Sequence, residues 1–309
     1  MALLKTLLAL AVLFALPVQK GRFSQEDYVS ETLTLRRARD EEFRSRKWSP
    51  LAVVAIAPLD RKKTTIGSGS KADLRLEAEN VAPLHAEILR EHDSAGRPAF
   101  RVRAVGGKVW TDSNPPDEIQ DVALELGARV RIGRFLVYWD NLGTFGAVVR
   151  ALDYTSTAFT HFKGLSYFPP DPNFRIPARV IAYPKAEKMM VADTHGWKRP
   201  AWRYGEALFK LKGTEYRLVL LVFDPKPGPK DKIFIAFSDE TRGSETYPAA
   251  RYLETPFVTA GHLTLDFNLA TNPLCAYNQG FACPLPPREN RLPVAIRAGE
   301  KIYPDAVGH

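Results

Sequence analysis

The chain has 309 residues, of which 45% are hydrophobic and 25% are charged. This balance excludes a chain that is disordered throughout, and the length fits about two domains of ordinary size. The 43 Lys and Arg residues outnumber the 35 Asp and Glu residues, giving a net charge of +8. Because both signs are interleaved along the chain, we expect a solvated basic surface and no nucleic-acid partner.

Residues 1–20 are predicted to be a signal peptide. Lys5 precedes an uncharged and mostly apolar run over residues 6–19. As a helix this run is too short for a hydrocarbon core of about 30 Å, but it suits the apolar region of a signal peptide. We therefore expect a secreted or periplasmic protein without a stable membrane span after cleavage. A membrane anchor and a buried helix are the alternatives, and the exact cleavage site stays open.

Residues 21–50 are predicted to form a helical connector. Ser24 is a favourable N-cap, acidic residues follow it, and the segment ends in basic residues that suit the helix dipole. Apolar positions are sparse, so the helix is expected to pack through Tyr28, Leu35 and Phe43 and to leave a charged outer face. Such a helix would act as a brace between larger units.

Residues 51–152 have the texture of an antiparallel β-sandwich, with short runs of Val, Ile, Leu and aromatic residues separated by Gly, Asn, Asp and Pro. The candidate strands are Leu51–Ile56, Leu84–Arg90, Phe100–Ala104, Arg129–Ile132 and Phe135–Trp139. We expect these strands to pair in antiparallel fashion.

Three segments in this region resemble the forkhead-associated (FHA) β-sandwich. They are Thr65–Leu76, Asn80–Ile88 and Leu126–Gly133. Where the family places its phosphothreonine-binding Arg and the Ser that completes the phosphate contact, this chain has Ser68 and Ala82. Neither supplies a guanidinium fork, and Ala82 has no hydroxyl, so we expect an FHA-like fold without phosphopeptide recognition. By the same resemblance, His85 is expected to brace loops.

Residues 153–309 are predicted to form a second antiparallel β-barrel or sandwich. Alternating patterns at Arg203–Leu211, Tyr216–Phe223 and Lys232–Phe237 indicate strands, with Gly213 in a hairpin turn. From Thr271 onward, repeated prolines disfavour regular helix and central strand. This proline-rich tail should wrap irregularly over the domain.

Several long motifs closely resemble the bacterial family called domain of unknown function 1684, over about residues 48–303. They are Leu165–Asp171, Phe237–Tyr247 with Arg251–Leu253, Leu265–Asn268, Asn272–Tyr277 and Cys283–Glu300. The resemblance implies an exported or periplasmic protein with a two-part layout, and it implies no activity or cofactor. One local departure is Ala249-Ala250, where the family commonly has glycine before the arginine.

The first candidate site lies within thirteen residues. It contains Asp239, Thr241, Glu245, Tyr247 and Arg251. This mixture can place a carboxylate acid/base pair, an anion-binding Arg and a phenolic donor around one pocket, with Asp239 and Glu245 as the catalytic candidates. The structural alternative is a turn over residues 239–243 that a buried Glu245–Arg251 ion pair ties to the barrel.

The second candidate site lies in the proline-rich tail. Its ligand-binding candidates are Asn268, Asn272, Glu289, Asn290 and Arg291, alongside Asp266 and Tyr277. The functional hypothesis places residues 289–291 in the same pocket as Glu245 and Arg251, around a small polar or anionic molecule such as a sugar or a peptidoglycan fragment. In the structural alternative, these side chains satisfy backbone groups that the prolines leave without partners.

Cys275 and Cys283 are the chain's two cysteines, and an oxidising compartment would allow them to form a disulfide. Their spacing is a poor fit to structural zinc, which usually has four Cys or His ligands. A metal site from His161, Asp171, Asp193 and His195 lacks any recognised spacing. We therefore expect no metal and no cofactor.

Two functions remain from the sequence. The first is an exported cell-envelope protein that binds a small polar ligand or an envelope protein. The alternative is a cell-envelope hydrolase that uses carboxylate general acid/base catalysis, which requires two carboxyl groups in one cleft with pKa values pushed apart.

Overall fold

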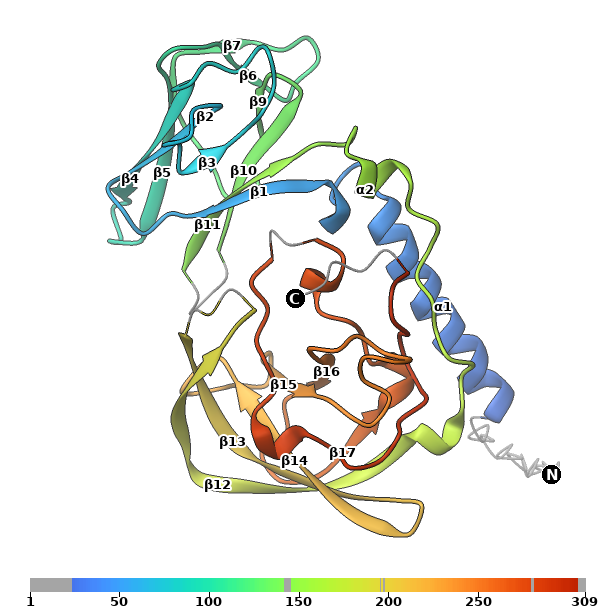
Figure 1. Ribbon diagram of the computed structural model, residues 1–309. Coiled ribbons are helices and arrows are strands. Elements are labelled where there is room, and N and C mark those ends of the chain that lie inside the picture. The colour runs from blue at the N-terminus through green and yellow to red at the C-terminus, as the bar shows by residue number, and fades with distance from the viewer. Residues whose placement is uncertain (1–23, 142–145, 195, 197, 279–280, 305–309) are drawn as a thin grey trace, which may run out of the picture.

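The computed structural model describes residues 24–141, 146–194, 196, 198–278 and 281–304. The fold is mainly β, with one long N-terminal helix, a two-sheet sandwich and a third sheet that leads into an irregular C-terminal chain (Figure 1). The predicted signal peptide lies outside the described residues. Within the described part, no helix has both the length and the apolar character needed to cross a membrane.

The predicted N-terminal helix forms as α1, Gln25–Arg44. A capping box begins it: the Ser24 hydroxyl accepts the Asp27 N–H at 3.0 Å, and the Asp27 carboxylate accepts the Ser24 N–H at 2.9 Å. The buried face consists of Tyr28, Thr32, Arg36 and Phe43. Leu35 is 48% exposed, so the prediction that it packs inward is wrong. The inward stripe passes through Arg36, and Leu35 is turned about 100° away from it.

Strands β1 to β11 form the two sheets of the sandwich. The bounds are β1 Val53–Pro58, β2 Lys63–Gly67, β3 Leu74–Arg75, β4 Ala86–His92, β5 Pro98–Ala104, β6 Val109–Thr111, β7 Glu118–Ile119, β8 Asp121–Ala123, β9 Val130–Ile132, β10 Phe135–Asn141 and β11 Ala147–Leu152. One sheet has the order β1-β11-β10-β9-β6-β7 and the other β3-β2-β4-β5-β8. Pairing is antiparallel except between β2 and β3, which agrees with the predicted antiparallel fold.

Strand β10 is buried on both of its faces. Phe135, Val137 and Trp139 belong to the core between the two sheets. Leu136 and Tyr138, on the opposite face, belong to a second core that includes Phe43 of α1 and residues of the C-terminal tail. Because side chains alternate along a strand, β10 joins the sandwich to the rest of the molecule.

His85 braces the loops of the sandwich. It is 2% exposed, and its Nδ1 accepts the N–H of Ala82 at 3.1 Å. Nε2 therefore carries the ring proton and donates to the carbonyl of Lys108 at 2.9 Å. The Ser68 hydroxyl donates to the carbonyl of Val81 at 2.7 Å, so it too serves a neighbouring loop.

Strands β12 to β17 form a six-stranded half-barrel in the order β16-β15-β14-β13-β12-β17. The bounds are β12 Arg175–Ala192, β13 Lys198–Leu211, β14 Thr214–Val222, β15 Lys232–Phe237, β16 Arg251–Pro256 and β17 Gly261–Asp266. The predicted turn joins β13 to β14: Lys212 and Gly213 have φ of 51° and 83°. Positive φ at both positions is characteristic of the type I′ turn of a two-residue hairpin.

The proline-rich tail wraps irregularly over the half-barrel. Its regular elements are single turns of 3-10 helix: η5 Leu274–Ala276 and η6 Arg288–Asn290, preceded by η4 Phe267–Leu269. Isolated bridges tie the tail to earlier segments, joining Tyr167 to Glu300 and Ser238 to Arg291. Two further short helices, α2 Thr157–Thr160 and η3 Pro172–Phe174, lie on the connection between the sandwich and β12, and η1 Pro50–Ala52 leads into β1.

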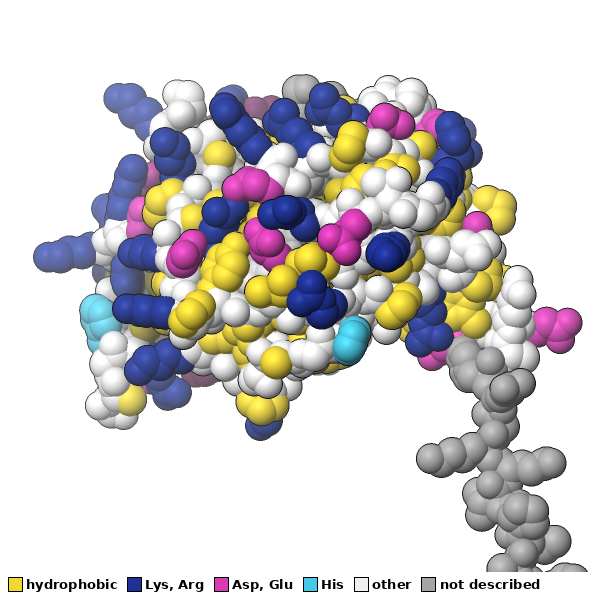
Figure 2. All heavy atoms as spheres, turned by 90° about the horizontal axis from the view of Figure 1, so that it is seen from below, with side chains coloured by type: hydrophobic (Ala, Val, Ile, Leu, Met, Phe, Trp, Pro, Cys, Tyr) yellow, Lys and Arg dark blue, Asp and Glu magenta, His cyan; other side chains and the backbone are white. Residues whose placement is uncertain are grey.

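Lys and Arg side chains are spread over the lower face of the molecule, with Asp and Glu side chains among them (Figure 2). Many exposed basic residues also have an acidic partner, such as Lys232 with Glu254 at 2.6 Å. On this face the positive charge is therefore mixed with negative charge.

Candidate functional site

Asp239 and Arg251 form a buried ion pair between the end of β15 and the start of β16. Arg251 Nη2 lies 2.5 Å from Asp239 Oδ2, and each side chain is 1% exposed. Arg251 also donates to the carbonyls of Ile296 and Ala298 in the tail. Burial lowers the pKa of Arg251, while Asp239 acts in the opposite direction. The pair thus fastens the tail to the half-barrel.

The second oxygen of Asp239 is occupied as well. Oδ1 accepts the Thr241 N–H at 2.9 Å, the Thr241 hydroxyl at 2.6 Å and the Ile296 N–H at 3.2 Å. The Thr241 hydroxyl also lies 2.8 Å from that of Thr246. With both carboxylate oxygens engaged inside the protein, Asp239 closes a turn.

Glu245 pairs with Arg297 and not with Arg251, so the predicted Glu245–Arg251 ion pair is wrong. The Glu245 carboxylate accepts from Arg297 Nε at 2.9 and 3.0 Å, and hydrogen bonding from Arg297 lowers the Glu245 pKa. Its side chain is 34% exposed, in contrast to the buried Asp239. The sequence alone does not decide between Asp239 and Glu245 as the partner of Arg251, because both carboxylates lie within the twelve residues before it.

Cys275 and Cys283 of the tail pack with Tyr247 in the core that the tail shares with α1 and β10. Both cysteines are free thiols, and they are not at disulfide distance. The prediction of a disulfide between Cys275 and Cys283 is therefore wrong. Cys283 Sγ accepts the backbone N–H of Cys275 at 3.3 Å, and a hydrogen bond with Cys275 together with burial raises the Cys283 pKa well above its usual range. Burial also raises the pKa of Tyr247.

The two thiols should be unreactive in the native protein. A raised pKa keeps Cys283 protonated, and the thiolate is the form that attacks disulfide reagents. We expect a thiol titration with an aromatic disulfide reagent to detect almost no reaction at pH 8. After denaturation in guanidinium chloride without reductant, it should detect two thiols per chain. A denatured protein with no reactive thiol would instead mean that the cysteines are joined.

Three asparagines of the second candidate site satisfy buried backbone. Asn290 spans two strands: it accepts the Val219 N–H at 2.6 Å and donates to the carbonyls of Val219 and Ala236 at 3.0 and 2.9 Å. Asn268 accepts the Asp171 N–H at 2.9 Å and donates to the Asp171 carbonyl at 2.8 Å. Asn272 Nδ2 donates to the carbonyl of Lys301 at 2.8 Å. Asn268 and Asn290 are fully buried, so their polar groups serve the fold.

Glu289 of η6 and Arg291, the residue that follows η6, lie at the surface. They line a shallow cavity of about 230 Å³ together with Leu208, Glu215 and Arg217, and Glu289 pairs with Arg203. Hydrogen bonds to the Glu289 carboxylate lower its pKa. Glu245 and Arg251 are not among the described residues that line this cavity, so the prediction of one pocket shared by both candidate sites is wrong.

Glu300 is the centre of a buried polar network that was not predicted from the sequence. Its carboxylate is fully buried and pairs with Arg39 Nε at 2.5 Å. The other oxygen accepts the Tyr277 hydroxyl and the Asn272 N–H, each at 2.6 Å. Glu300 raises the pKa of Arg39 against the effect of burial, and burial together with Glu300 raises the pKa of Tyr277. The network couples α1 to the tail.

A local signal for this network exists beside Glu300. Gly299 has φ of 79°, and a Cβ there would lie 2.6 Å from the carbonyl oxygen of Ala270. Only glycine fits such a close approach. A Gly-Glu pair at the end of a proline-rich tail can thus mark a carboxylate directed inward, although its partner Arg39 is more than 250 residues away.

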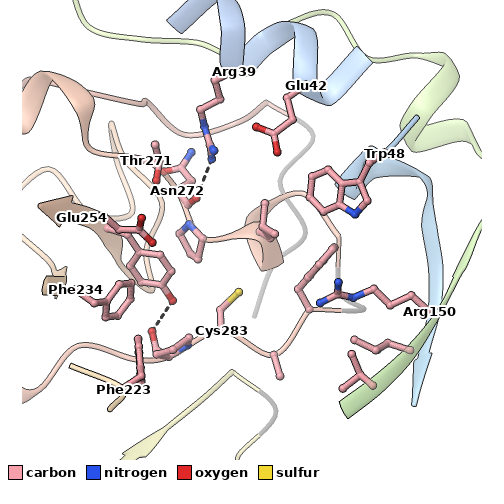
Figure 3. Close-up of a pocket in the computed structure, with 18 of the residues that line it drawn as sticks. Arg39, Glu42, Trp48, Arg150, Phe223, Phe234, Glu254, Thr271, Asn272 and Cys283 are labelled. Carbon is pink, nitrogen blue, oxygen red and sulfur yellow. Dashed lines mark hydrogen bonds between the residues drawn. The ribbon is translucent and has the colours of Figure 1, made fainter. Parts of the chain in front are cut away.

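A mostly apolar hollow lies where α1, the sandwich and the tail meet, and we call it the junction cavity (Figure 3). Its volume is about 480 Å³. Its lining consists of Arg39, Glu42, Trp48, Ile56, Ala57, Pro58, Val148, Arg150, Phe223, Phe234, Tyr252, Glu254, Thr271, Asn272, Pro273, Leu274, Phe281, Ala282, Cys283 and Pro284. Of the candidate site residues, Asn272 and Cys283 belong to this lining.

Asn272 is oriented by the Glu300 network. Its Nδ2 donates to the carbonyl of Lys301 at 2.8 Å and to the Tyr277 hydroxyl at 3.1 Å. Because a carbonyl can only accept, this contact fixes the amide orientation. Oδ1 is then left as a buried acceptor without a hydrogen-bond partner. Buried acceptors of this kind are uncommon in native proteins.

Arg150 of β11 extends into the junction cavity, on the opposite side from Phe234 and Glu254 (Figure 3). Its side chain is 6% exposed, and Nη1 lies 2.5 Å from Asp140 Oδ2. The guanidinium carbon is 5.4 Å from the centroid of the Phe281 ring, a cation–π distance. The Arg150 Nε–H is buried and has no acceptor.

The residues considered for a metal do not assemble. His161 caps α2 and contacts the Thr157 carbonyl, whereas Asp171 caps η3. Asp193 is buried near the tail, bridged to Pro284, and His195 lies outside the described residues. Over the residues that the structure describes, no group of three or more His, Cys, Asp or Glu side chains is placed to hold a metal ion.

Comparison with known proteins finds a family without an assigned activity. A family model described as a protein of unknown function (DUF1684) matches residues 160–301. No curated protein matches the chain. The match begins after the sandwich, so the resemblance of the sandwich to FHA domains stays a prediction.

Two solved structures are similar over parts of the chain. An uncharacterized protein from gene locus rrnAC0354 of Haloarcula marismortui is 34% identical, and the match covers 46% of this chain and 78% of that chain with a TM-score of 0.39. The Slr1951 protein from Synechocystis sp. is 18% identical over 34% of this chain and 98% of that chain, with a TM-score of 0.23.

Proposed function

This chain belongs to the DUF1684 family through residues 160–301, and we propose that it is a binding protein that holds a small, largely apolar molecule in the junction cavity. The observation that carries the proposal is the composition of the cavity wall. Trp48, Phe223, Phe234 and Phe281 contribute aromatic surface, while few polar groups face them. Ligand sites are typically apolar cavities of about 300–1,000 Å³ with a small number of polar groups that orient the ligand.

The assembly of the cavity from distant segments also supports binding. Trp48 follows α1, Arg150 lies in β11, Phe223 follows β14 and Phe281 lies in the tail. Pockets between structural units are frequent ligand sites. The Glu300 network fixes the position of the wall at Asn272, because it anchors the backbone of that residue.

A binding role is favoured over a carboxylate hydrolase by the state of the two candidate carboxyl groups. General acid/base hydrolysis needs two carboxyls that face one cleft with divergent pKa values. Asp239 accepts hydrogen bonds from the protein on both oxygens, and Glu245 is partly exposed and paired with Arg297. Neither Asp239 nor Glu245 is among the described residues that line the junction cavity.

We place this binding protein in the cell envelope, after export. The support is the apolar run at residues 6–19 behind Lys5, which suits a signal peptide.

In this proposal the sandwich is a structural and protein-contact unit without phosphopeptide recognition. The Ser68 hydroxyl donates to the Val81 carbonyl, and Ala82 has no hydroxyl. A phosphothreonine peptide should then bind no better than its unphosphorylated counterpart.

The proposed function is tested by a thermal-shift screen of the mature protein against small apolar and amphipathic molecules. A molecule that binds the native state raises the unfolding free energy by about 2.7 kcal/mol when present at about 100 times its Kd. We expect at least one such molecule to raise Tm. In the variant Ala282→Trp, the added indole would occupy the cavity and abolish the shift.

The matched control is Ala123→Trp, which adds the same side chain on exposed β8, outside the lining of the cavity. This variant should keep the full shift. A screen without any shift, or a shift that survives Ala282→Trp, would contradict binding in the junction cavity.

A further inference from the structure

We infer that the ligand of the junction cavity is an amphipathic molecule with an oxyanion head group, such as a carboxylate, bound by Arg150. This inference rests on the proposed function and specifies the chemical class of the ligand. The apolar body of the ligand lies against the aromatic wall, and its head accepts from the guanidinium.

The main observation is an N–H group of Arg150 that has no hydrogen-bond acceptor. Asp140 occupies Nη1 at 2.5 Å, on the end of the guanidinium. The Nε–H, on the side of the group, has no acceptor although it is buried. Leaving such a donor unsatisfied costs free energy, and the cost is larger for a charged group. An oxygen from a ligand would remove this cost, and guanidinium groups commonly bind carboxylates through two parallel N–H groups.

The environment of Arg150 strengthens a contact to an anion. Its side chain is 6% exposed, whereas that of Asp140, its protein partner, is 37% exposed. Water therefore screens the charge of Asp140 more than that of Arg150. Phe281 lies at a cation–π distance on one side of the guanidinium, which keeps the group within the aromatic part of the cavity.

The acidic residues of the lining do not cancel this preference. Glu42 and Glu254 are both exposed, and Glu254 pairs with Lys232 at 2.6 Å. Exposed charges interact weakly across a solvated rim. Arg39, the other basic residue of the lining, is already neutralised by the buried Glu300. Among the described residues of the lining, Arg150 is thus a buried charged side chain whose Nε–H still lacks an acceptor.

The test compares pairs of probes that share an apolar body and differ in the head group: decanoate with decanol, and cinnamate with cinnamyl alcohol. Calorimetry on the full mature chain gives Kd for each. Hydrogen bonds to charged groups predict that the acid of at least one pair binds about 10- to 100-fold more tightly than its alcohol. In Arg150→Met, which keeps an apolar side chain of similar length, this preference should disappear while the alcohol binds as before.

Arg61→Met is the matched control. Arg61 also pairs with an aspartate, Asp73 at 3.2 Å, but its side chain is 74% exposed and it does not line the cavity. It should retain the full preference. Arg150→Lys keeps the charge without the Nε–H and should show a reduced preference, which gives a second variant if Arg150→Met does not fold.

Failure of the head-group inference and failure of the proposed function give different results. If acid and alcohol bind the wild-type protein equally, or if Arg150→Met keeps the preference, the head-group inference is overturned and the cavity remains a binding site. If neither member of either pair binds and the screen with Ala282→Trp also finds no cavity ligand, both the inference and the proposed function fail.

Discussion

Replacing Arg251 by methionine is expected to lower the free energy of unfolding by about 3–5 kcal/mol, the usual effect of removing one partner from a buried ion pair. Asp239 would be left as a buried charge, since both side chains are 1% exposed. The tail would also lose the donors that bind the carbonyls of Ile296 and Ala298. Denaturation in urea, followed by circular dichroism, measures the change.

The double variant Asp239→Leu with Arg251→Met separates the charge from the packing. Buried ion pairs can often be replaced by apolar residues at little cost, so the double variant should be more stable than Arg251→Met alone. It should not reach the wild-type value, because Thr241 and Ile296 lose the acceptor on Asp239. A loss below about 1 kcal/mol in Arg251→Met would show that the pair contributes no more than an exposed one.

Asn290→Leu is expected to cost about 3 kcal/mol or more. The substitution removes the partners of three buried backbone groups, on Val219 and Ala236, and an unsatisfied buried group costs about 1–3 kcal/mol. Strands β14 and β15 have a single registered pair, Leu221 with Phe234. The amide of Asn290 therefore takes the place of ladder hydrogen bonds between these strands. Hydrogen exchange at the amide of Val219 should accelerate in the variant.

Asn173→Leu provides the comparison for Asn290. Asn173 is exposed, and its amide donates to Asp171 within the same turn. Surface substitutions usually change stability by less than about 0.5 kcal/mol. Equal losses for the two variants would mean that the leucine side chain, and not the lost backbone contacts, is responsible.

The elements that the sequence predicted correctly are those whose signal lies within a few consecutive residues. Ser24 and Asp27 begin α1 through a capping box, and the turn at Lys212 and Gly213 joins β13 to β14. The strand texture between residues 51 and 152 gave a sandwich. In each case a short run of the sequence contains all the physical information that the element needs.

Strand β12 was not predicted from the sequence. Prolines at 177 and 184 argue against a central strand, because proline cannot donate to a ladder, yet β12 extends over 18 residues between β13 and β17. A register shift between Ala182 and Glu187 accommodates Pro184. The apolar residues Ile176, Ala178 and Val180 alternate along the sequence, and their side chains are buried in the structure. Their packing outweighs the effect of the prolines.

The candidate site was harder to predict than the fold, for a physical reason. Polar residues close together in sequence, such as those from Asp239 to Arg251, attracted attention, but they serve a turn and its ion pair. The junction cavity instead brings together Arg39, Arg150 and Phe281, which lie more than 100 residues apart. No sequence periodicity links such positions, because the cavity depends on how the helix, the sandwich and the tail pack. The resemblance of the motifs to one family pointed to the tail without revealing its partners.

A crystal structure of the protein with the strongest ligand of the screen would locate the binding site directly. We predict electron density for the apolar body of the ligand against Phe223, Phe234 and Phe281, inside the junction cavity. Density at another place, such as the groove between α1 and residues 165–170 that Leu33 and Phe168 line, with the junction cavity empty, would contradict the proposed binding site.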